Sequence, residues 1–166
     1  MTSLIKVDSI QTSSGGTPTA SSLGIGGVGK IGQVLTTHVA SAVTTTSTTF
    51  TAHTNVSVNI TPTSTSSKIL VFISTNMDAQ NTGYTGYYTI YRDSTNLNVN
   101  PQTRGFTQTF SNSGRVITPT HVSVLDSPAT TSQITYGGYF RVSNSGGTVG
   151  VGGDADSVIT VMEVLA

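Results

Sequence analysis

Three histidines are the first residues of this chain whose chemistry could serve a function. His38, His53 and His121 all lie in or near threonine-rich segments that we expect to be β-strands. None has a second histidine or an acid at the spacing of metal ligands, so each is expected to be a polar residue on a strand face. A trimer would be an exception, because one histidine near its axis supplies three ligands. The sequence leaves that possibility open, and we expect no metal site within a single chain.

Two carboxylates stand close together in a glycine-rich segment near the C-terminus. Asp154 and Asp156 follow Gly152-Gly153 and are separated by one alanine. Calcium binds carboxylate oxygens of this kind, but a calcium site needs more oxygen ligands than two side chains supply. The segment contains no third acid. We therefore favour a solvated turn before the last strand over a calcium site.

Enzyme chemistry finds little support in the remaining polar residues. His121 and Asp126 lie near many serines, but the Gly-x-Ser-x-Gly turn of a serine hydrolase is absent. Glycoside hydrolysis needs two placed carboxylates, and Glu163 is the only glutamate and lies within the terminal strand. The acids are otherwise scattered. We expect no enzyme activity, no catalytic residue and no cofactor.

A glycine-rich segment matches part of a phosphate-binding loop. Gly24 to Lys30 has the glycine and lysine spacing of such a loop, but Ile31 stands where the magnesium-binding Ser or Thr belongs. No apolar strand precedes the segment and no helical pattern follows it, so the amide cradle and helix dipole are missing. A glycine-rich arm is the better interpretation.

Tyrosines gather in one part of the sequence. Tyr84, Tyr87, Tyr88 and Tyr91 follow a segment rich in amides. Tyrosine rings stack on the apolar faces of sugars or on proteins, and amides bind hydroxyls, so the cluster suits a receptor contact. Alternate tyrosines that fill a core from one strand explain it equally well. The candidate receptor-contact residues are Tyr84, Tyr87, Asn76 and Asn81.

The elements that must position these residues are organised around Ser67–Met77. Its run of apolar residues is too short for a membrane helix and lacks the spacing of an amphipathic helix. We therefore interpret Lys68–Ser74 as a central strand buried on both faces. The other apolar segments alternate with polar residues, so one face of each meets water or another sheet.

About ten short strands separated by turns are expected, with no helical period anywhere. Val34–Val43 and Val56–Ile60 alternate, and Pro119 within Val116–Leu125 suggests an edge strand or a bulge. Asn76–Gly83 is predicted to be a loop, Gly137-Gly138 a bulge, and Asn144–Gly147 a hairpin turn. This order predicts an all-β protein, a sandwich or a jelly roll.

The first 33 residues differ in composition from the rest. Their Gly, Ser and Thr content cannot bury enough apolar surface to fold alone. Scattered apolar residues favour an extended arm that docks onto another surface over a pure linker. We therefore divide the chain into an arm (1–33) and a β-domain (34–166). The candidate docking residues are Leu4, Ile5, Val7, Ile10, Leu23 and Ile25.

Composition sets limits on partners. Seven basic and seven acidic residues cancel, so no charge excess points to nucleic acid or acidic lipid. Charged residues make up 8% of the chain, against about 25% in ordinary globular proteins. A polar but hardly charged surface suits either a threonine-rich soluble protein or one whose surface is buried in an oligomer or particle, and we favour the second. We expect no disulfide, signal peptide or membrane span.

Several short motifs resemble those of known viral proteins. Ile5 to Gly15, read Ile-Lys-Val-Asp-Ser-Ile-Gln-Thr-Ser-Ser-Gly, resembles the N-terminal segments of tail-fibre and other virion proteins from phages of aquatic bacteria. Ile60 to Val71 resembles the middle of their small β-domains. Four later motifs resemble further parts of them: Tyr91-Arg-Asp-Ser, Leu125-Asp-Ser-Pro-Ala-Thr-Thr-Ser, Ile134-Thr-Tyr and Ile159-Thr-Val-Met-Glu. The motifs are short, and together they span most of the chain.

This resemblance implies a jelly roll like that of tumour-necrosis-factor-type and complement-head-type domains, assembled as a homotrimer on the virion exterior. The protein would dock to other tail or capsid proteins through its arm and display the β-domain to a host-surface glycan or protein. The chain lacks a coiled-coil or β-helical shaft, which leaves a short tail fibre and a capsid decoration protein as alternatives. A bacterial adhesin and a polysaccharide-degrading enzyme are further ones. Core and trimer contacts would come from Ile69, Val71, Phe72, Ile73, Val158, Val161, Met162 and Val164.

Overall fold

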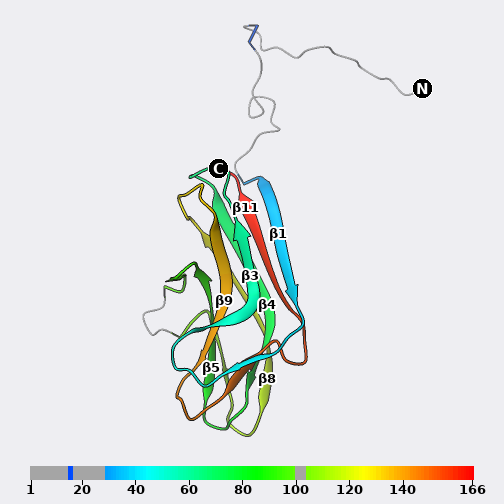
Figure 1. Cartoon of the computed structure of the whole chain (residues 1–166), viewed down its shortest axis with the longest axis vertical. Coiled ribbons are helices and arrows are strands. Elements are labelled where there is room, and N and C mark those ends of the chain that lie inside the picture. Colours follow the sequence, from blue (N-terminus) through cyan, green and yellow to red (C-terminus); the bar gives the residue numbers. More distant parts are fainter. Residues whose placement is uncertain (1–14, 17–28, 100–103) are drawn as a thin grey trace, which may run out of the picture.

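The computed structural model describes residues 15–16, 29–99 and 104–166. In these residues the chain forms strands and turns only, and the strands build two antiparallel sheets packed face to face (Figure 1). The predicted all-β sandwich is therefore confirmed, whereas its jelly-roll connectivity stays a prediction. The candidate arm residues Leu4, Ile5, Val7, Ile10, Leu23 and Ile25 lie outside the described residues.

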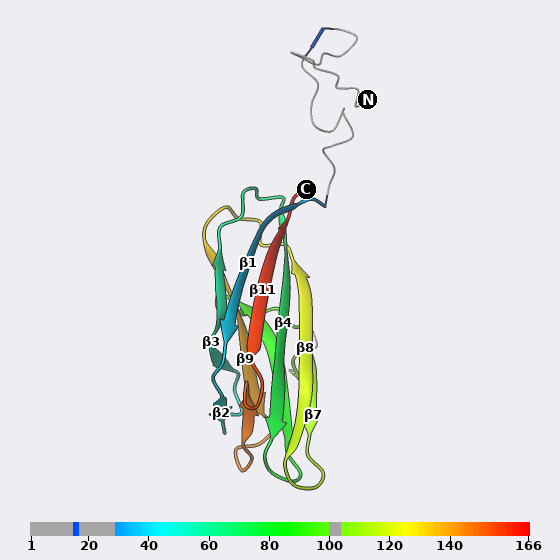
Figure 2. The same ribbon diagram turned by 90° about the vertical axis from the view of Figure 1, so that its right-hand side faces the viewer.

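Sheet A contains six strands. Four of them lie side by side in the order β1-β11-β4-β8 (Figure 2), and β10 and β2 continue the sheet beside the second half of β4. Their bounds are β1 (Ile31–Val39), β2 (Val43–Thr45), β4 (Lys68–Ala79), β8 (Val116–Asp126), β10 (Val149–Val151) and β11 (Ser157–Val164).

Sheet B contains five strands. Its order is β3-β9-β5-β6, with β7 also paired to β5. Their bounds are β3 (Thr51–Ile60), β5 (Thr85–Arg92), β6 (Thr95–Asn96), β7 (Thr107–Phe110) and β9 (Ile134–Val142). Strand β1 begins at Ile31, three residues before the predicted start of the β-domain.

The core fills the space between the sheets, as alternation along each strand requires. Alternate residues of β4 and β11 point inward from sheet A and meet the inward side chains of β3, β5 and β9. The largest of the fully buried apolar and aromatic side chains are Tyr88, Tyr136, Phe140, Ile60, Ile69, Ile73, Met77, Ile90 and Ile159.

The prediction that Lys68–Ser74 is buried on both faces is wrong for the single chain. Ile69, Val71 and Ile73 point into the core, but Phe72 on the opposite face is 42% exposed. A strand of consecutive apolar residues has an apolar surface on both faces, and both are usually buried. Sheet B buries only one face of β4. Among the described residues, none covers the other face of β4.

Two other local predictions are corrected. The expected loop at Asn76–Gly83 is strand up to Ala79, because Met77 and Ala79 continue the inward alternation of β4 into the core. The turn at Asn144–Gly147 exists, and Gly147 donates its amide hydrogen to the Asn144 carbonyl oxygen. It is not a hairpin, since it joins β9 of sheet B to β10 of sheet A. The turn residues determine a chain reversal but not which strands pair.

Pro119 and the two glycines mark real features of the sheets. Strand β8 pairs only with β4 among the described strands, so Pro119 lies on an edge strand as predicted. The irregularity near Gly137-Gly138 lies opposite them, in β3, where the pairing shifts between Ala52 and Ser57. Gly138 faces the core, and a Cβ there would lie 2.0 Å from the Tyr88 hydroxyl. The missing side chain leaves the space that this hydroxyl occupies.

Candidate interaction surfaces

The outer face of sheet A is apolar where its four long strands lie side by side. The strand register places Val34, Met162, Leu70 and Leu125 in one row across β1, β11, β4 and β8. Val34 and Leu125, at the two edges, are 54% and 51% exposed. We call this row and its outward neighbours the sheet A face; the neighbours are Ile31, Phe72, Val158 and Val164.

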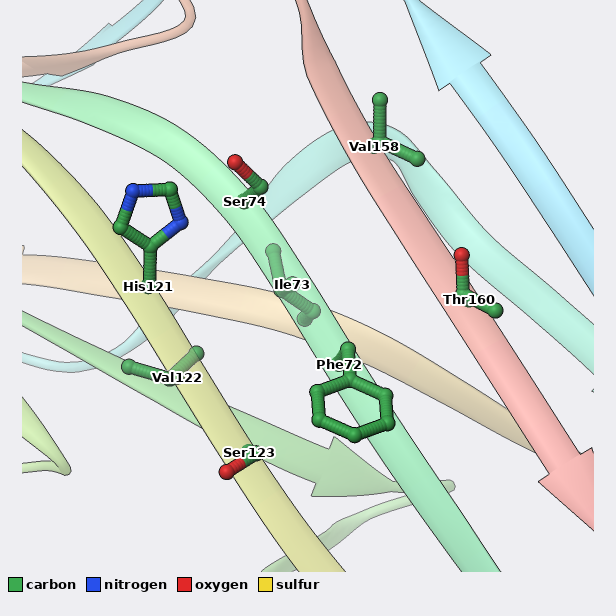
Figure 3. Close-up of a pocket in the computed structure, with 8 residues that line it drawn as sticks. All are labelled: Phe72, Ile73, Ser74, His121, Val122, Ser123, Val158 and Thr160. Carbon is green, nitrogen blue, oxygen red and sulfur yellow. The ribbon is translucent and has the colours of Figure 1, made fainter.

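The sheet A face also contains a hollow of about 330 Å³ beside Phe72. Figure 3 shows Phe72 on β4 and His121 on β8 flanking it, with Val158 and Thr160 on β11. An exposed aromatic ring thus lies next to a depression on the same surface. Such a surface is suited to receive a side chain from an apolar partner that packs against it.

Charged and titratable side chains lie at the ends of the sheet A face. At one end of the face, Lys68 lies beside Val164. At the other end, His38 and His121 lie in one row across the sheet with Val158 and Ser74 between them. His38 Nε2 lies 3.1 Å from an Asp156 oxygen on the protein surface. Between these ends the outward side chains are apolar or carry hydroxyls. An exposed patch of this kind marks an interaction site more often than ordinary surface.

The outer face of sheet B carries a different group of side chains. Tyr91 and Tyr139 are stacked with ring centroids 4.1 Å apart, and Phe50 meets Tyr91 edge to face at 6.2 Å. The Arg141 guanidinium lies 4.4 Å from the centroid of the Tyr87 ring and 5.2 Å from that of Phe50. These five residues form the aromatic–arginine cluster, which faces away from the sheet A face.

A buried carboxylate links the first and last strands of the β-domain at one end of the sandwich. Glu163 of β11 is fully buried and accepts hydrogen bonds from the Thr63 amide (2.7 Å), the Thr63 hydroxyl (2.8 Å) and the Gln33 amide group (2.7 Å). Burial by itself raises the pKa of a carboxyl, but these bonds overcome it and lower the pKa of Glu163 to about 2. The carboxylate therefore stays charged and links β1, β11 and the turn before β4.

His53 is buried in the core against Tyr88. Its Nδ1 lies 2.9 Å from the Tyr88 hydroxyl, and its Nε2 is buried without a hydrogen-bond partner. Burial lowers the pKa of His53 to about 4 and raises that of Tyr88 above its ordinary value. The imidazole is therefore neutral at pH 7 and cannot act as a general acid there.

The two carboxylates of the predicted acidic turn have different partners. Asp154 is bound by Arg115 at 3.0 Å, and the same guanidinium donates to Asp78 at 2.9 Å, whereas Asp156 pairs with His38. Within residues 15–16, 29–99 and 104–166, no three His, Asp or Glu side chains form a group that could hold a metal ion. The turn is thus tied to β4 and β8 by an arginine.

The predicted core and trimer residues divide by strand alternation into two sets. Ile69, Val71, Ile73 and Val161 lie in the core, while Phe72, Val158, Met162 and Val164 point outward on the sheet A face. Sequence reasoning missed Val34, Leu70 and Leu125, which complete the row. The alternation of β1 and β8 indicated that Val34 and Leu125 share a face with other apolar residues of their own strands. Only the strand register shows that these residues align with Leu70 across the sheet.

The predicted receptor-contact residues are not brought together. Tyr87 belongs to the aromatic–arginine cluster, whereas Tyr84 packs against Gly146 and Gly147. Asn81 accepts a hydrogen bond from the Thr148 amide at 2.7 Å. Asn76 is buried on β4 and donates to the Gly153 carbonyl, so it lies apart from Tyr87, and its receptor contact stays a prediction. Phe50, Tyr139 and Arg141 were missed because they lie far from Tyr87 in sequence.

Comparisons with known proteins add no relative. No protein-family model matches the chain, and no curated protein matches it. No helix among the described residues is long and apolar enough to cross a membrane.

Proposed function

We propose that this protein is a structural component of the phage virion surface, a short, homotrimeric, fibre-like protein. In this proposal residues 1–33 dock it to another virion protein and the β-domain faces the host. The sheet A face is the observation that carries the proposal. The row of Val34, Leu70, Leu125 and Met162 is exposed at its two edges and half-buried between them, and no described residue of the chain covers it.

Sister copies of the chain are the partners that best fit this face. It offers both a projecting ring, Phe72, and an adjacent hollow of about 330 Å³, so that one copy can fill the depression of another. The middle of the face lacks charged side chains, which removes repulsion between identical surfaces. The low charge of the whole chain agrees with a protein that works inside an assembly.

The strand order supports the jelly-roll part of the proposal. Strands β1, β11, β4 and β8 of sheet A face β3, β9, β5 and β7 of sheet B. Along the chain, most successive long strands change sheet, as when β3 is followed by β4 and β8 by β9. Crossing between two sheets in this way is typical of jelly rolls.

The positions of the chain ends and of the two outer sheet faces fit a β-domain that is displayed to the host. Gly29 donates to the Leu165 carbonyl, and Leu165 donates to the Lys30 carbonyl, so the residues just before β1 lie beside the C-terminal end of the β-domain. The outer faces of the two sheets point in opposite directions (Figure 1). Association through sheet A therefore leaves sheet B and the loops at the other end free for contact.

Replacing Leu125 by glutamate is expected to convert the trimer into monomers. The substitution places a charge in the row of apolar side chains, where burial against a sister copy would desolvate it. The matched control is Phe110→Glu, because Phe110 on β7 is 52% exposed and lies outside the sheet A face. Native mass spectrometry of the purified chain measures the outcome. The wild type and Phe110→Glu are expected as trimers and Leu125→Glu as a monomer.

Either of two outcomes overturns the association. A monomeric wild type at micromolar concentration would mean that the sheet A face has a different occupant. A trimer that survives Leu125→Glu would mean that the copies pack through another surface. Far-ultraviolet circular dichroism of both variants checks that the sandwich is folded.

A capsid decoration protein is the second candidate within this class. It is favoured by a sandwich that occupies residues 31–164 with no shaft-like repeat among the described residues. A fibre is present in few copies at the tail, whereas a decoration protein covers the head in many. Quantifying the protein in purified virions against the major capsid protein is expected to give the low ratio of a fibre. A ratio near that of the capsid protein would favour decoration.

A further inference from the structure

The aromatic–arginine cluster lies on the outer face of sheet B, away from the proposed association surface. Its five side chains come from three segments: Phe50 just before β3, Tyr87 and Tyr91 on β5, and Tyr139 and Arg141 on β9. The register pairs Tyr87 directly with Arg141, so these two side chains share one row. The strand pairing therefore fixes how the cluster is arranged.

The rings of the cluster support one another. Tyr139 stacks on Tyr91 with an interplanar angle of 26°, and Phe50 meets Tyr91 at 60°. The Arg141 guanidinium lies over both Tyr87 and Phe50, and its Nη1 donates to the Val142 carbonyl at 3.2 Å. Side chains held in this way lose little conformational freedom when a ligand binds.

A hollow of about 350 Å³ opens within this cluster. It is lined by Thr48, Thr49, Phe50, Tyr91 and Arg141. The threonine segment is ordered by Ser47, whose hydroxyl accepts from the Thr49 amide at 3.1 Å and whose carbonyl accepts from the Val142 amide at 2.9 Å. The hollow thus combines two aromatic rings, two hydroxyls and one cation on a pre-ordered surface.

We propose that this hollow binds an acidic saccharide, with a sugar ring against Phe50 and Tyr91 and its carboxylate at Arg141. Aromatic rings pack against the C–H faces of pyranose rings, and the Thr48 and Thr49 hydroxyls can bond sugar hydroxyls. This deepens the proposed function by naming the ligand class of the displayed surface, and its biological meaning rests on that function.

The positive charge of Arg141 favours an acidic sugar over a neutral one. Arg141 is the one residue among the five lining the hollow that is charged at neutral pH, and a guanidinium pairs with a carboxylate through two parallel hydrogen bonds. The lining of hydroxyls, rings and a cation also differs from the sheet A face, whose row is aliphatic and whose middle carries no charge. A saccharide with a uronate group matches both the rings and the cation.

The experiment measures binding of the purified full chain to three probes by isothermal titration calorimetry. The probes are oligogalacturonate, its methyl ester, in which the carboxylates are neutralised, and an oligomer of glucose. Oligogalacturonate is expected to bind, and the methyl ester to bind about tenfold more weakly or worse because the pair with Arg141 is lost.

Three variants locate the site. Tyr91→Leu keeps the apolar bulk but removes the ring, and Arg141→Gln removes the charge; each is expected to weaken binding about fivefold or more. Phe110→Leu, at an exposed ring position on β7 outside the cluster, is expected to bind like the wild type. Thermal melting checks that each variant is folded, and Arg141→Gln tests the proposal if Tyr91→Leu does not fold.

The proposal is overturned if none of the probes binds, if the ester or the glucose oligomer binds as well as the acid, or if both cluster variants bind normally. Because binding is measured on the isolated protein, these failures leave the trimer and its Leu125→Glu test untouched. Conversely, loss of the trimer would not remove a site that lies within one chain.

Discussion

Replacing Glu163 by alanine is expected to lower the free energy of unfolding by about 2–3 kcal/mol, because it removes the hydrogen bonds that neutral donors make to a charged acceptor. The Thr63 amide, the Thr63 hydroxyl and the Gln33 amide group would each lose the acceptor that they reach at 2.7–2.8 Å. A hydrogen bond to a charged group contributes more to stability than one between neutral groups. Urea denaturation at fixed protein concentration, followed by circular dichroism, measures the loss.

Glutamine at the same position is the matched control. Glu163→Gln keeps the size and one acceptor oxygen, so we expect a smaller loss of about 1–2 kcal/mol. The variants also differ from the wild type in pH dependence. The folded-state pKa of Glu163, about 2, lies below the unfolded value of 4.5. Its stabilisation is therefore present above pH 4.5 and lost as the pH falls toward 2, and Glu163→Gln should lack that loss.

If Glu163→Ala lowers the free energy of unfolding no more than Glu163→Gln does, the hydrogen bonds to Glu163 do not stabilise this end of the sandwich. The same measurement bears on the arm. Gln33 is one of the three donors, and it belongs to the segment first assigned to the arm. A deletion meant to remove only docking residues should therefore end before Gly29, since β1 begins at Ile31.

Acidification from pH 7 to pH 4 is expected to destabilise the protein by about 3 kcal/mol through His53 alone. The pKa of this buried imidazole falls from 6.5 in the unfolded chain to about 4 in the fold. Protonation therefore favours the unfolded state. The stability is complete above pH 6.5 and declines as the pH falls toward 4.

His53→Asn tests this origin, because an amide can still bond the Tyr88 hydroxyl but does not titrate in this range. The variant is expected to be less stable at pH 7, since it leaves a small cavity, yet to show a flatter profile between pH 6.5 and 4. Glu163→Gln serves as the control, because the Glu163 carboxyl affects stability only below pH 4.5 and leaves the range from pH 6.5 to 4.5 to His53. An unchanged slope in His53→Asn would assign the pH dependence to other groups.

Some features of the fold could be predicted because they depend on local patterns. Period-two alternation in Val56–Ile60 indicated a strand with one apolar face, and the absence of any helical period indicated the all-β class. Pro119 indicated an edge strand because proline removes a ladder donor. Each of these inferences needs only a few neighbouring residues.

The two candidate surfaces depend on long-range pairing, which local patterns do not encode. Leu70 and Leu125 face outward side by side because β4 and β8 pair in a particular register. Shifting β8 by one residue against β4 would turn Leu125 to the other face and break the row. The sequence therefore indicated apolar strands, and only the register shows that four of their residues form one row.

The same reason explains the tyrosines and the buried glutamate. Sequence alone placed Tyr87 near Asn76 and Asn81, but alternation and pairing put it beside Arg141, far away in the chain. Glu163 was visible as the only glutamate, yet its partners Gln33 and Thr63 come from distant segments. By itself the sequence determined an all-β chain with low charge. The tertiary structure decided which side chains meet, because contacts between sheets and strands are set by register and packing.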